Sequence, residues 1–331
     1  MPDLFPGQKR TRKGFCMTTK QKKPDKTDAE AVRQRVEMLI KNFEAELRKG
    51  ALRRKVLALI PIFQGLRDLG KALIPAEYAS AARDRILYYF RKYPRTIIKS
   101  DELLVVSGIQ EYARRVRELR VQFGWSIVSG VTIKEMKEAE GEEVPDKFGK
   151  MKPDEYMLLD KKQDRDAAHR WNTANTIRKE RTGVRNKILK FLRANVGLGV
   201  TGEELRYVAG DKTEWARRVR ELRTEFGWPI ATKSTGRPDL GVGVYVLQAN
   251  RQSPEHDRSI PDDVRREVLR RDGYKCQSCD WSHDEWNPSD PRHLELHHIK
   301  HHAKGGENVR GNLKTLCTVC HDKVHRRSKK K

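Results

Sequence analysis

Four cysteines near the C-terminal end of the sequence have the spacing of a metal site. They form two Cys-x-x-Cys pairs, Cys276 with Cys279 and Cys317 with Cys320. Four thiolates at such spacing typically bind one zinc ion in a closed tetrahedral site, with no position left for a substrate. We therefore expect a structural zinc ion, which this small module would need in order to fold.

Histidines lie between and just after the cysteine pairs, and they add chemistry that a closed zinc site lacks. The stretch Leu294–Ile299 is predicted to be a strand, which would place His297 and His298 on opposite sides. His321 and His325 are one turn apart on the helix expected next, so they share a face. Phosphodiester hydrolysis needs a base that deprotonates water, a cation beside the phosphate, and help for the leaving oxygen. Histidines in this arrangement fit the first two needs.

The pattern from about Val264 to His325 resembles that of the HNH nuclease family, which has the ββα-metal fold. The family's elements occur in its order: a Cys-x-x-Cys hairpin, Leu294-Glu-Leu-His-His-Ile299, Gly305-Gly306, Asn312-Leu313, and Leu316-Cys-x-x-Cys-His321-x-x-x-His325. The joint pattern is far rarer than a single Cys-x-x-Cys pair. The resemblance implies a C-terminal endonuclease domain with this fold.

The resemblance also implies a role for each residue of the site. His298 would be the general base, and Asn312 would brace the loop that orients it. His297 and His321 would bind one catalytic divalent ion, with His325 as a third ligand or a phosphate contact. The family often has an aspartate at the position of His297. Histidine there leaves Mg²⁺, Mn²⁺, Ni²⁺ and Zn²⁺ open as the catalytic metal.

The charge of the chain favours a polyanionic partner. Its 331 residues include 70 Lys and Arg against 46 Asp and Glu, a net charge of +24. Such an excess suits double-stranded DNA, because each Lys or Arg that meets a phosphate releases condensed counterions. No apolar run is long enough to cross a membrane, and the basic N-terminal stretch lacks the apolar core of a secretory signal. We therefore expect a cytoplasmic, nucleoid-associated protein.

A repeated segment in the middle of the chain could hold this DNA. Residues 112–127 and 215–230 share Ala-Arg-Arg-Val-Arg-Glu-Leu-Arg and Phe-Gly-Trp at the same spacing. Two shorter helical segments precede each copy, and two short apolar strands follow it. This order resembles that of winged-helix DNA-binding domains. In the first copy, a long charged loop over about residues 134–154 would separate the two strands.

The third helix of each copy is expected to face the core with its apolar residues and DNA with its arginines. Arginine can fork onto guanine in a major groove or clamp phosphates, and we expect mainly phosphate contacts. One or two arginines of each helix are expected to pair with Glu118 or Glu221 instead. The predicted DNA contacts are Arg114, Arg115, Arg117 and Arg120 in the first copy and Arg217, Arg218, Arg220 and Arg223 in the second.

The sequence therefore predicts a multidomain, mainly α-helical protein with small β wings. An N-terminal helical hairpin, which Pro61 would kink or divide, serves either for packing against the next domain or for dimerisation. The expected parts are a basic disordered tail (1–27), the hairpin (28–80), a first winged-helix domain (81–160), a polar linker or solvated helix (161–183), a second winged-helix domain (184–249), a second linker (250–262) and the nuclease domain with its zinc site (263–331).

The function that the resemblance implies is a double-stranded DNA endonuclease, and a restriction enzyme in particular. It would leave 5′-phosphate and 3′-hydroxyl ends by a one-metal mechanism, and a dependence on base methylation is a further hypothesis. Cutting both strands takes two active sites or two events, so we expect a homodimer. Two alternatives stay open: a phage or mobile-element HNH enzyme that nicks one strand, and a zinc-containing DNA-binding regulator without catalysis.

Overall fold

The computed structural model describes residues 28–48, 51–140, 146–253, 258–287, 289–300 and 305–328. The tail predicted over residues 1–27 lies outside this part of the chain. Contacts divide the chain into two units, Met1–Ala76 and Glu77–Lys331, and each is described by itself. Among the described helices, none combines the length and the apolarity needed to cross a membrane.

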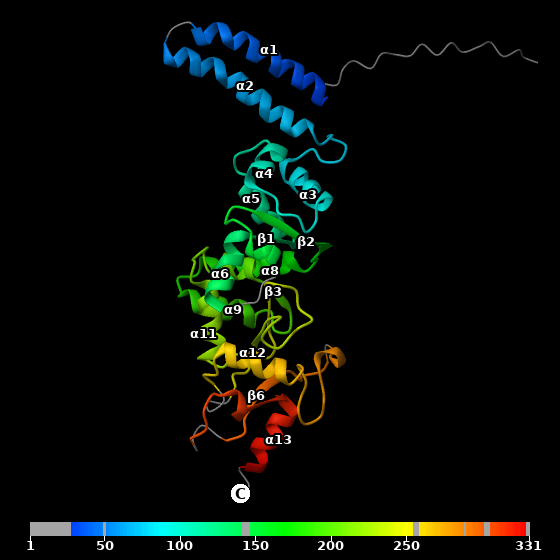
Figure 1. The fold of residues 1–331 in the computed structure, drawn as a ribbon, viewed down its shortest axis with the longest axis vertical. Helices are drawn as coiled ribbons and strands as arrows, with labels where there is room; N and C mark the ends of the chain where they lie inside the picture. Colours follow the sequence, from blue (N-terminus) through cyan, green and yellow to red (C-terminus); the bar gives the residue numbers. More distant parts are fainter. Residues whose placement is uncertain are drawn as a thin grey trace, which may run out of the picture. The chain divides into compact units, whose positions relative to one another are not determined.

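The first unit is a helical hairpin, as the sequence predicts. Helix α1 (Ala29–Arg48) and helix α2 (Leu52–Ala72) run side by side (Figure 1). Buried Val36 packs against Gly65, where an added Cβ would meet Val36 Cγ2 at 2.8 Å, so this glycine allows the helices to approach closely. Pro61 lies inside α2, and the helix continues through it without being divided.

The first copy of the repeat contains the three helices and two strands that the sequence predicts. A π-helical turn over Glu118–Gln122 extends its third helix, and β1 and β2 pair antiparallel. The loop expected between the two strands contains two helices instead. The elements are α3 (Ala82–Lys92), α4 (Ser100–Ser107), α5 (Tyr112–Arg117), β1 (Trp125–Ser129), α6 (Gly130–Glu140), α7 (Asp146–Gly149) and β2 (Tyr156–Gln163).

The second copy has the same three helices and an additional short strand. Its strands form an antiparallel sheet in the order β3-β5-β4, and Trp215, Val219 and Leu222 of its third helix are buried as predicted. The capping box of Thr201 and Glu204 is also present. The elements are α9 (Val184–Arg193), β3 (Gly199–Thr201), α10 (Gly202–Val208), α11 (Trp215–Thr224), β4 (Ile230–Ala231) and β5 (Val244–Leu247).

Helix α8 (Ala167–Lys179) corrects the prediction of a polar linker or solvated helix over residues 161–183. Its Ala174 and Ile177 are buried in the core of the second copy. Its buried Arg170 donates to Glu204 Oε1 at 2.8 Å and also pairs with Asp164. The composition is misleading here because the charge of Arg170 is satisfied by two carboxylates, of which that of Glu204 is buried with it.

The two copies pack together. Val121 and Met136 of the first copy lie in the same core as Trp215 and Leu222 of the second. The Nε1 of Trp215 donates to Glu135 Oε2 of α6 at 2.7 Å, so the helix that replaces the expected loop joins the copies.

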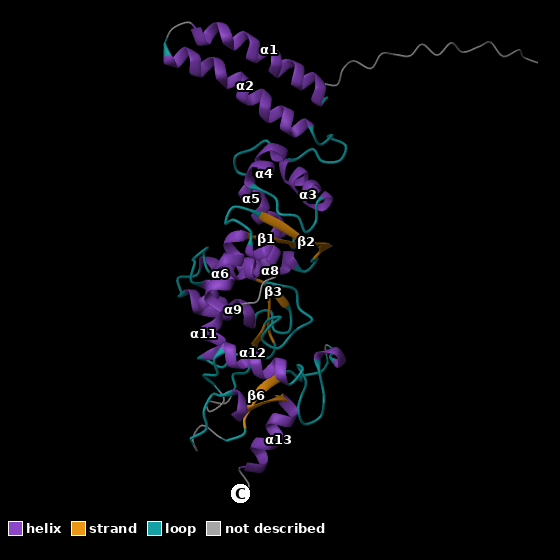
Figure 2. Cartoon of the chain, viewed as in Figure 1, coloured by secondary structure: helices purple, strands orange, loops and turns teal. Residues whose placement is uncertain are grey.

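The described part of the C-terminal module contains a pair of strands, an α-helix before them and another after them, and short 3₁₀ turns (Figure 2). Strands β6 (Leu294–His298) and β7 (Leu313–Cys317) pair antiparallel, with His298 opposite Leu313. Helix α12 (Asp262–Arg271) precedes them, and α13 (Thr318–Ser328) follows β7 directly. Leu294 at the start of β6 lies opposite Cys317, so the start of β6 lies beside the start of α13, and His297 lies near His321 and His325 farther along that helix.

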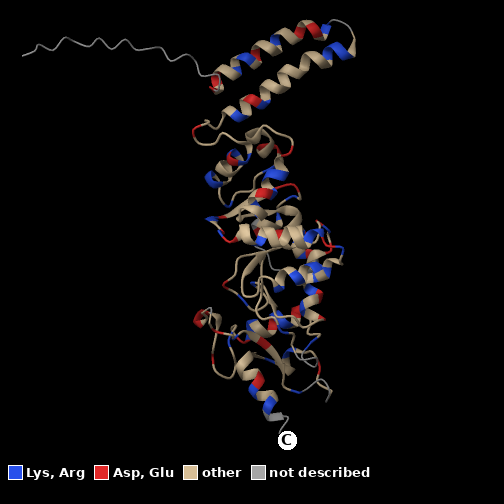
Figure 3. Ribbon diagram, turned by 180° about the vertical axis from the view of Figure 1, so that it is seen from behind, with Lys and Arg blue, Asp and Glu red and all other residues tan. Residues whose placement is uncertain are grey.

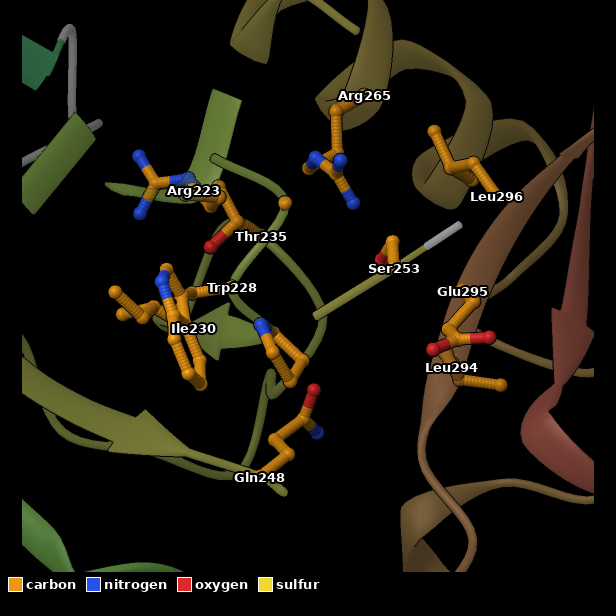
Figure 4. A pocket seen from close by; sticks show the side chains of 12 residues that line it. Arg223, Trp228, Ile230, Thr235, Gln248, Ser253, Arg265, Leu294, Glu295 and Leu296 are labelled. Atoms are coloured by element: carbon orange, nitrogen blue, oxygen red, sulfur yellow. The ribbon is translucent and has the colours of Figure 1, made fainter. Parts of the chain in front are cut away.

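A buried ion pair joins the C-terminal module to the second copy. Arg223 Nε of α11 donates to Asp262 Oδ1 of α12 at 2.8 Å, and the two side chains are 2% and 6% exposed. Beside this pair, a cavity of about 20 Å³ has room for a single water molecule. Figure 4 shows Arg223, Thr235 and Gln248 on one side of the cavity and Glu295 of β6 on the other.

Candidate active site

The four cysteines come together at the start of α13 and form one cluster. Their sulfurs all lie within 4.8 Å of one another, and Cys279 Sγ is 3.8 Å from Cys317 Sγ. A tetrahedral zinc ion with bonds of about 2.3 Å separates its sulfur ligands by about 3.8 Å. Cys276, Cys317 and Cys320 are buried, and Cys279 is exposed. The cluster could therefore hold a structural zinc ion.

Three histidines form a second cluster, separate from the cysteines. His297 comes from the end of β6, and His321 and His325 come from one face of α13, as their spacing predicts. The Nε2 atoms of His321 and His325 are 2.9 Å apart. Two nitrogen ligands at a right angle about a metal, at about 2.1 Å from it, are separated by about 3.0 Å. The geometry fits a divalent ion that has open positions for water and phosphate.

Glu295 holds His321 in place beneath this cluster. Its Oε2 lies 2.6 Å from Nδ1 of His321, and its Oε1 lies 3.2 Å from Nε2 of His293. Burial alone would raise the pKa of Glu295, but the hydrogen bonds from His293 and His321 outweigh it and hold the pKa well below its ordinary value. The charged carboxylate keeps the proton of His321 on Nδ1, so Nε2 presents its lone pair to a metal.

His298 turns away from the cluster toward the loop before β7. Its ring is fully buried, and its Nε2 lies 2.7 Å from Oδ1 of Asn308. Nδ2 of Asn308 donates to the carbonyl oxygen of Ser259 at 3.0 Å. A carbonyl can only accept, so Nδ2 must face Ser259 and Oδ1 must face His298. The proton of neutral His298 is then on Nε2, and Nδ1 is the atom that can act as a base.

Asn312 braces the loop that follows His298, as the family resemblance implies. Its Oδ1 accepts from the backbone nitrogen of Lys300 at 2.8 Å, and its Nδ2 donates to the carbonyls of Lys300 and Glu307, both at 3.0 Å. Gly306 makes this packing possible, because a Cβ there would lie 1.8 Å from the Lys300 carbonyl oxygen. The role of Asn312 in catalysis stays a prediction.

Comparison with protein-family models identifies the module that contains both clusters. Residues 276–327 match the HNH endonuclease model. The C-terminal domain is an HNH endonuclease domain. Residues 83–159 and 185–248 match the model of the KpnI N-terminal domain, and these stretches contain the two copies of the repeat. Comparisons with curated proteins and with solved structures gave no match. The two domain matches support a DNA endonuclease.

Two arginines expected to contact DNA are largely shielded from solvent instead. Arg120 is 10% exposed, and its Nη1 lies 3.0 Å from Oε1 of Glu203 in the second copy. Arg223 pairs with Asp262 of the HNH domain. The prediction is wrong for both, because each guanidinium neutralises a buried carboxylate between packed parts of the protein.

The remaining arginines of the two helices stay accessible to different degrees. Arg217 is 62% exposed and Arg114 is 66% exposed. As the alternative predicts, Glu118 pairs with Arg114 and Arg115, and Glu221 pairs with Arg217 and Arg218. Arg117 is exposed, and Arg220 is half-buried. Figure 3 shows that Lys and Arg occur throughout the described helices, interspersed with Asp and Glu.

Sequence reasoning missed two residues of the HNH domain. Glu295 and His297 are two residues apart on β6, so their side chains share a face of the strand. This spacing could have indicated that Glu295 lies at the metal cluster. Asn308 carries no comparable signal, since its partners His298 and Ser259 are 10 and 49 residues away in the chain.

Proposed function

We propose that the protein is a restriction endonuclease that cuts double-stranded DNA at a specific site. The observation that carries this proposal is the pairing of His298 with Asn308 next to a three-histidine cluster. One histidine is held in the tautomer of a general base, and the other three can hold a cation for the phosphate. A regulator that only binds DNA would have no use for this arrangement.

The chemistry assigned to the HNH domain is hydrolysis at phosphorus. Nδ1 of His298 accepts a proton from water, and the water oxygen bonds to phosphorus. The bond from phosphorus to the 3′-oxygen breaks, and this oxygen takes up a proton from solvent. A divalent ion held by His297, His321 and His325 would neutralise charge on the phosphate. The products are a 5′-phosphate and a 3′-hydroxyl. A zinc ion at the cysteines would serve the fold alone.

We assign the DNA contacts to α5 and α11 in two winged-helix domains. The order of elements in the second copy supports this proposal: helix, strand, two helices and two strands. Arg217 and Arg114 are the most exposed arginines assigned as contacts in their helices. They suit contact with phosphates beside a major groove, and methylated bases could be read in the same groove.

We infer that two copies act together, because each chain has one HNH site and duplex DNA has two strands. The competing functions are a nicking HNH enzyme and a regulator without catalysis. Supercoiled plasmid is incubated with Mg²⁺, Mn²⁺ or Ni²⁺, using methylated and unmethylated DNA, and the ends are sequenced. Linear DNA with defined ends supports restriction, whereas persistent open circles support nicking.

The variant His298→Ala tests the catalytic assignment against the regulator. Loss of cleavage with DNA binding retained supports the proposal, and a fully functional variant would overturn it. His169→Ala, at an exposed histidine of α8, is the matched control and is expected to cut like the original protein.

A further inference from the structure

Helix α2 carries an exposed apolar stripe with the spacing of a coiled coil. From Leu52 to Leu66 the side chains recur at alternating intervals of four and three residues, as do the a and d positions of a heptad. Gly70, which is buried, takes the next position, and Leu73, at the C-cap of the helix, takes the one after it. We call this stripe the α2 seam. Its apolar members are Leu52, Val56, Leu59, Phe63, Leu66 and Leu73.

The seam is distinct from the face that α2 turns to α1. Ile62 and Gly65 are buried toward α1, whereas Leu52 is 78% exposed and Phe63 is 67% exposed. Pro61 occupies the position of the heptad opposite the seam, so its missing N–H does not interrupt the stripe. The hairpin therefore uses one face of α2 and leaves a second apolar face uncovered within this unit.

The exposed apolar area of the α2 seam is larger than that of the largest apolar patch on a typical monomeric protein. With neighbouring Ile60, the seam exposes on the order of 700 Å², against roughly 300–600 Å² for the largest patch on a typical monomer. It approaches the ~800 Å² that each partner contributes to an interface of standard size. Two helices alone also provide too small a core for an independent domain.

We propose that the α2 seam pairs with the α2 seam of a second copy of this chain. A heptad stripe fits the ridges of another helix with the same repeat, and α2 of a second copy is such a helix. Pairing would combine two hairpins into a four-helix bundle, which buries both seams. The use of this dimer for cutting both strands rests on the proposed function, but the pairing itself does not.

The mass of the full-length protein in solution, measured over a concentration series, tests the pairing. Leu66→Glu places a carboxylate in the seam, and Leu57→Glu is the matched control on α2, at 51% exposed against 49% for Leu66. We expect a dimer for the original protein and for Leu57→Glu. Leu66→Glu should weaken dimerisation roughly 100-fold or more, because unpaired carboxylates would be buried. A monomeric original protein, or a Leu66→Glu dimer of undiminished strength, would overturn the proposal.

Cross-linking at the middle of the seam provides a second measurement. In a Cys16→Ser background, Phe63→Cys should form covalent dimers and Leu57→Cys should not, whichever way the two helices run. A monomer whose seam is protected from thiol reagents would mean that α2 packs on the rest of the chain. Binding of the monomer to anionic lipid vesicles would mean a membrane partner. Either outcome overturns self-pairing.

Cleavage assays separate the pairing from the nuclease function. Leu66→Glu should still nick plasmid, but it should produce linear DNA more slowly than Leu57→Glu does. A dimer that cuts no DNA would contradict the proposed function and leave the pairing intact. A monomer that linearises plasmid normally would contradict the pairing and leave the function intact.

Discussion

Asn308 connects His298 to the second copy of the repeat. Its Oδ1 lies 2.7 Å from His298 Nε2, and its Nδ2 donates to the Ser259 carbonyl at 3.0 Å. The backbone nitrogen of Ser259, a residue with φ of 64°, donates to the Thr224 carbonyl at the end of α11 at 2.7 Å. Three hydrogen bonds thus join the proposed base to α11, the helix to which we assign DNA contacts.

Replacing Asn308 should slow the chemical step without weakening DNA binding. We expect Asn308→Ala to lower the single-turnover cleavage rate roughly 100-fold, since His298 would lose its fixed tautomer and orientation. Asn308→Asp keeps an acceptor for His298 but loses the donor to Ser259, so it should recover part of this loss. Asn287→Ala, at an exposed asparagine of the HNH domain, is the control. Equal rates for Asn308→Ala and the control would contradict this role.

Glu295→Gln should weaken metal binding at the histidine cluster. The amide cannot provide the charge that orients His321, and losing such a partner typically costs 10–100-fold in metal affinity. Calorimetric titration of the zinc-loaded protein with Mn²⁺ measures the effect independently of cleavage. Glu267→Gln, at an exposed glutamate of α12, should bind Mn²⁺ like the original protein. An unchanged affinity in Glu295→Gln would show that the carboxylate does not support the site.

Arg223 should contribute to stability rather than to DNA binding. Arg223→Ala leaves Asp262 buried without its partner, which we expect to cost about 3–5 kcal/mol in the free energy of unfolding of the joined domains. The double variant Arg223→Met with Asp262→Leu removes both charges and should recover most of this loss. Urea unfolding followed by tryptophan fluorescence gives the midpoints. A stable Arg223→Ala with weaker DNA affinity would restore the original assignment.

The same ion pair should make stability depend on pH in the acidic range. Burial alone would raise the pKa of Asp262, but the charge and hydrogen bonds of Arg223 outweigh it and lower the pKa. The stabilisation is therefore complete above the ordinary aspartate pKa, about 3.9, and is lost as the pH falls through the lowered value. Melting temperatures between pH 7 and pH 2 should fall more steeply for the original protein than for the double variant. If the melting temperatures of the two proteins fell in parallel with pH, the ion pair of Arg223 and Asp262 would be excluded as the cause of the pH dependence.

Removing a cysteine of the metal cluster should unfold the HNH domain. Cys320→Ser is expected to lose the bound zinc and the burial of Trp281, which lies in the same core as three of the cysteines. Zinc content by colorimetric assay and tryptophan fluorescence report the two effects. Cys16→Ser should keep the zinc content of the original protein. A folded Cys320→Ser protein with full nuclease activity would rule out a structural metal.

The site was predictable where its residues are close in the sequence. The Cys-x-x-Cys pairs and the one-turn spacing of His321 and His325 place their ligand atoms together through local geometry alone. The sequence could not distinguish the role of Arg223 from that of Arg217, because both extend from the same helix. Only the packing of α12 against this helix buries Arg223. Helix α8 was mistaken for a polar linker because composition does not reveal that Arg170 has a buried carboxylate partner, Glu204.

The shared core of the two repeat copies has a consequence for the DNA that the enzyme could recognise. Val121 and Met136 lie in one core with Trp215, and such a shared core would hold α5 and α11 at a single separation. A target read by both helices would then consist of two short sequence blocks separated by a constant number of base pairs. Adding or deleting one base pair between the blocks would rotate one block about the duplex axis and out of reach.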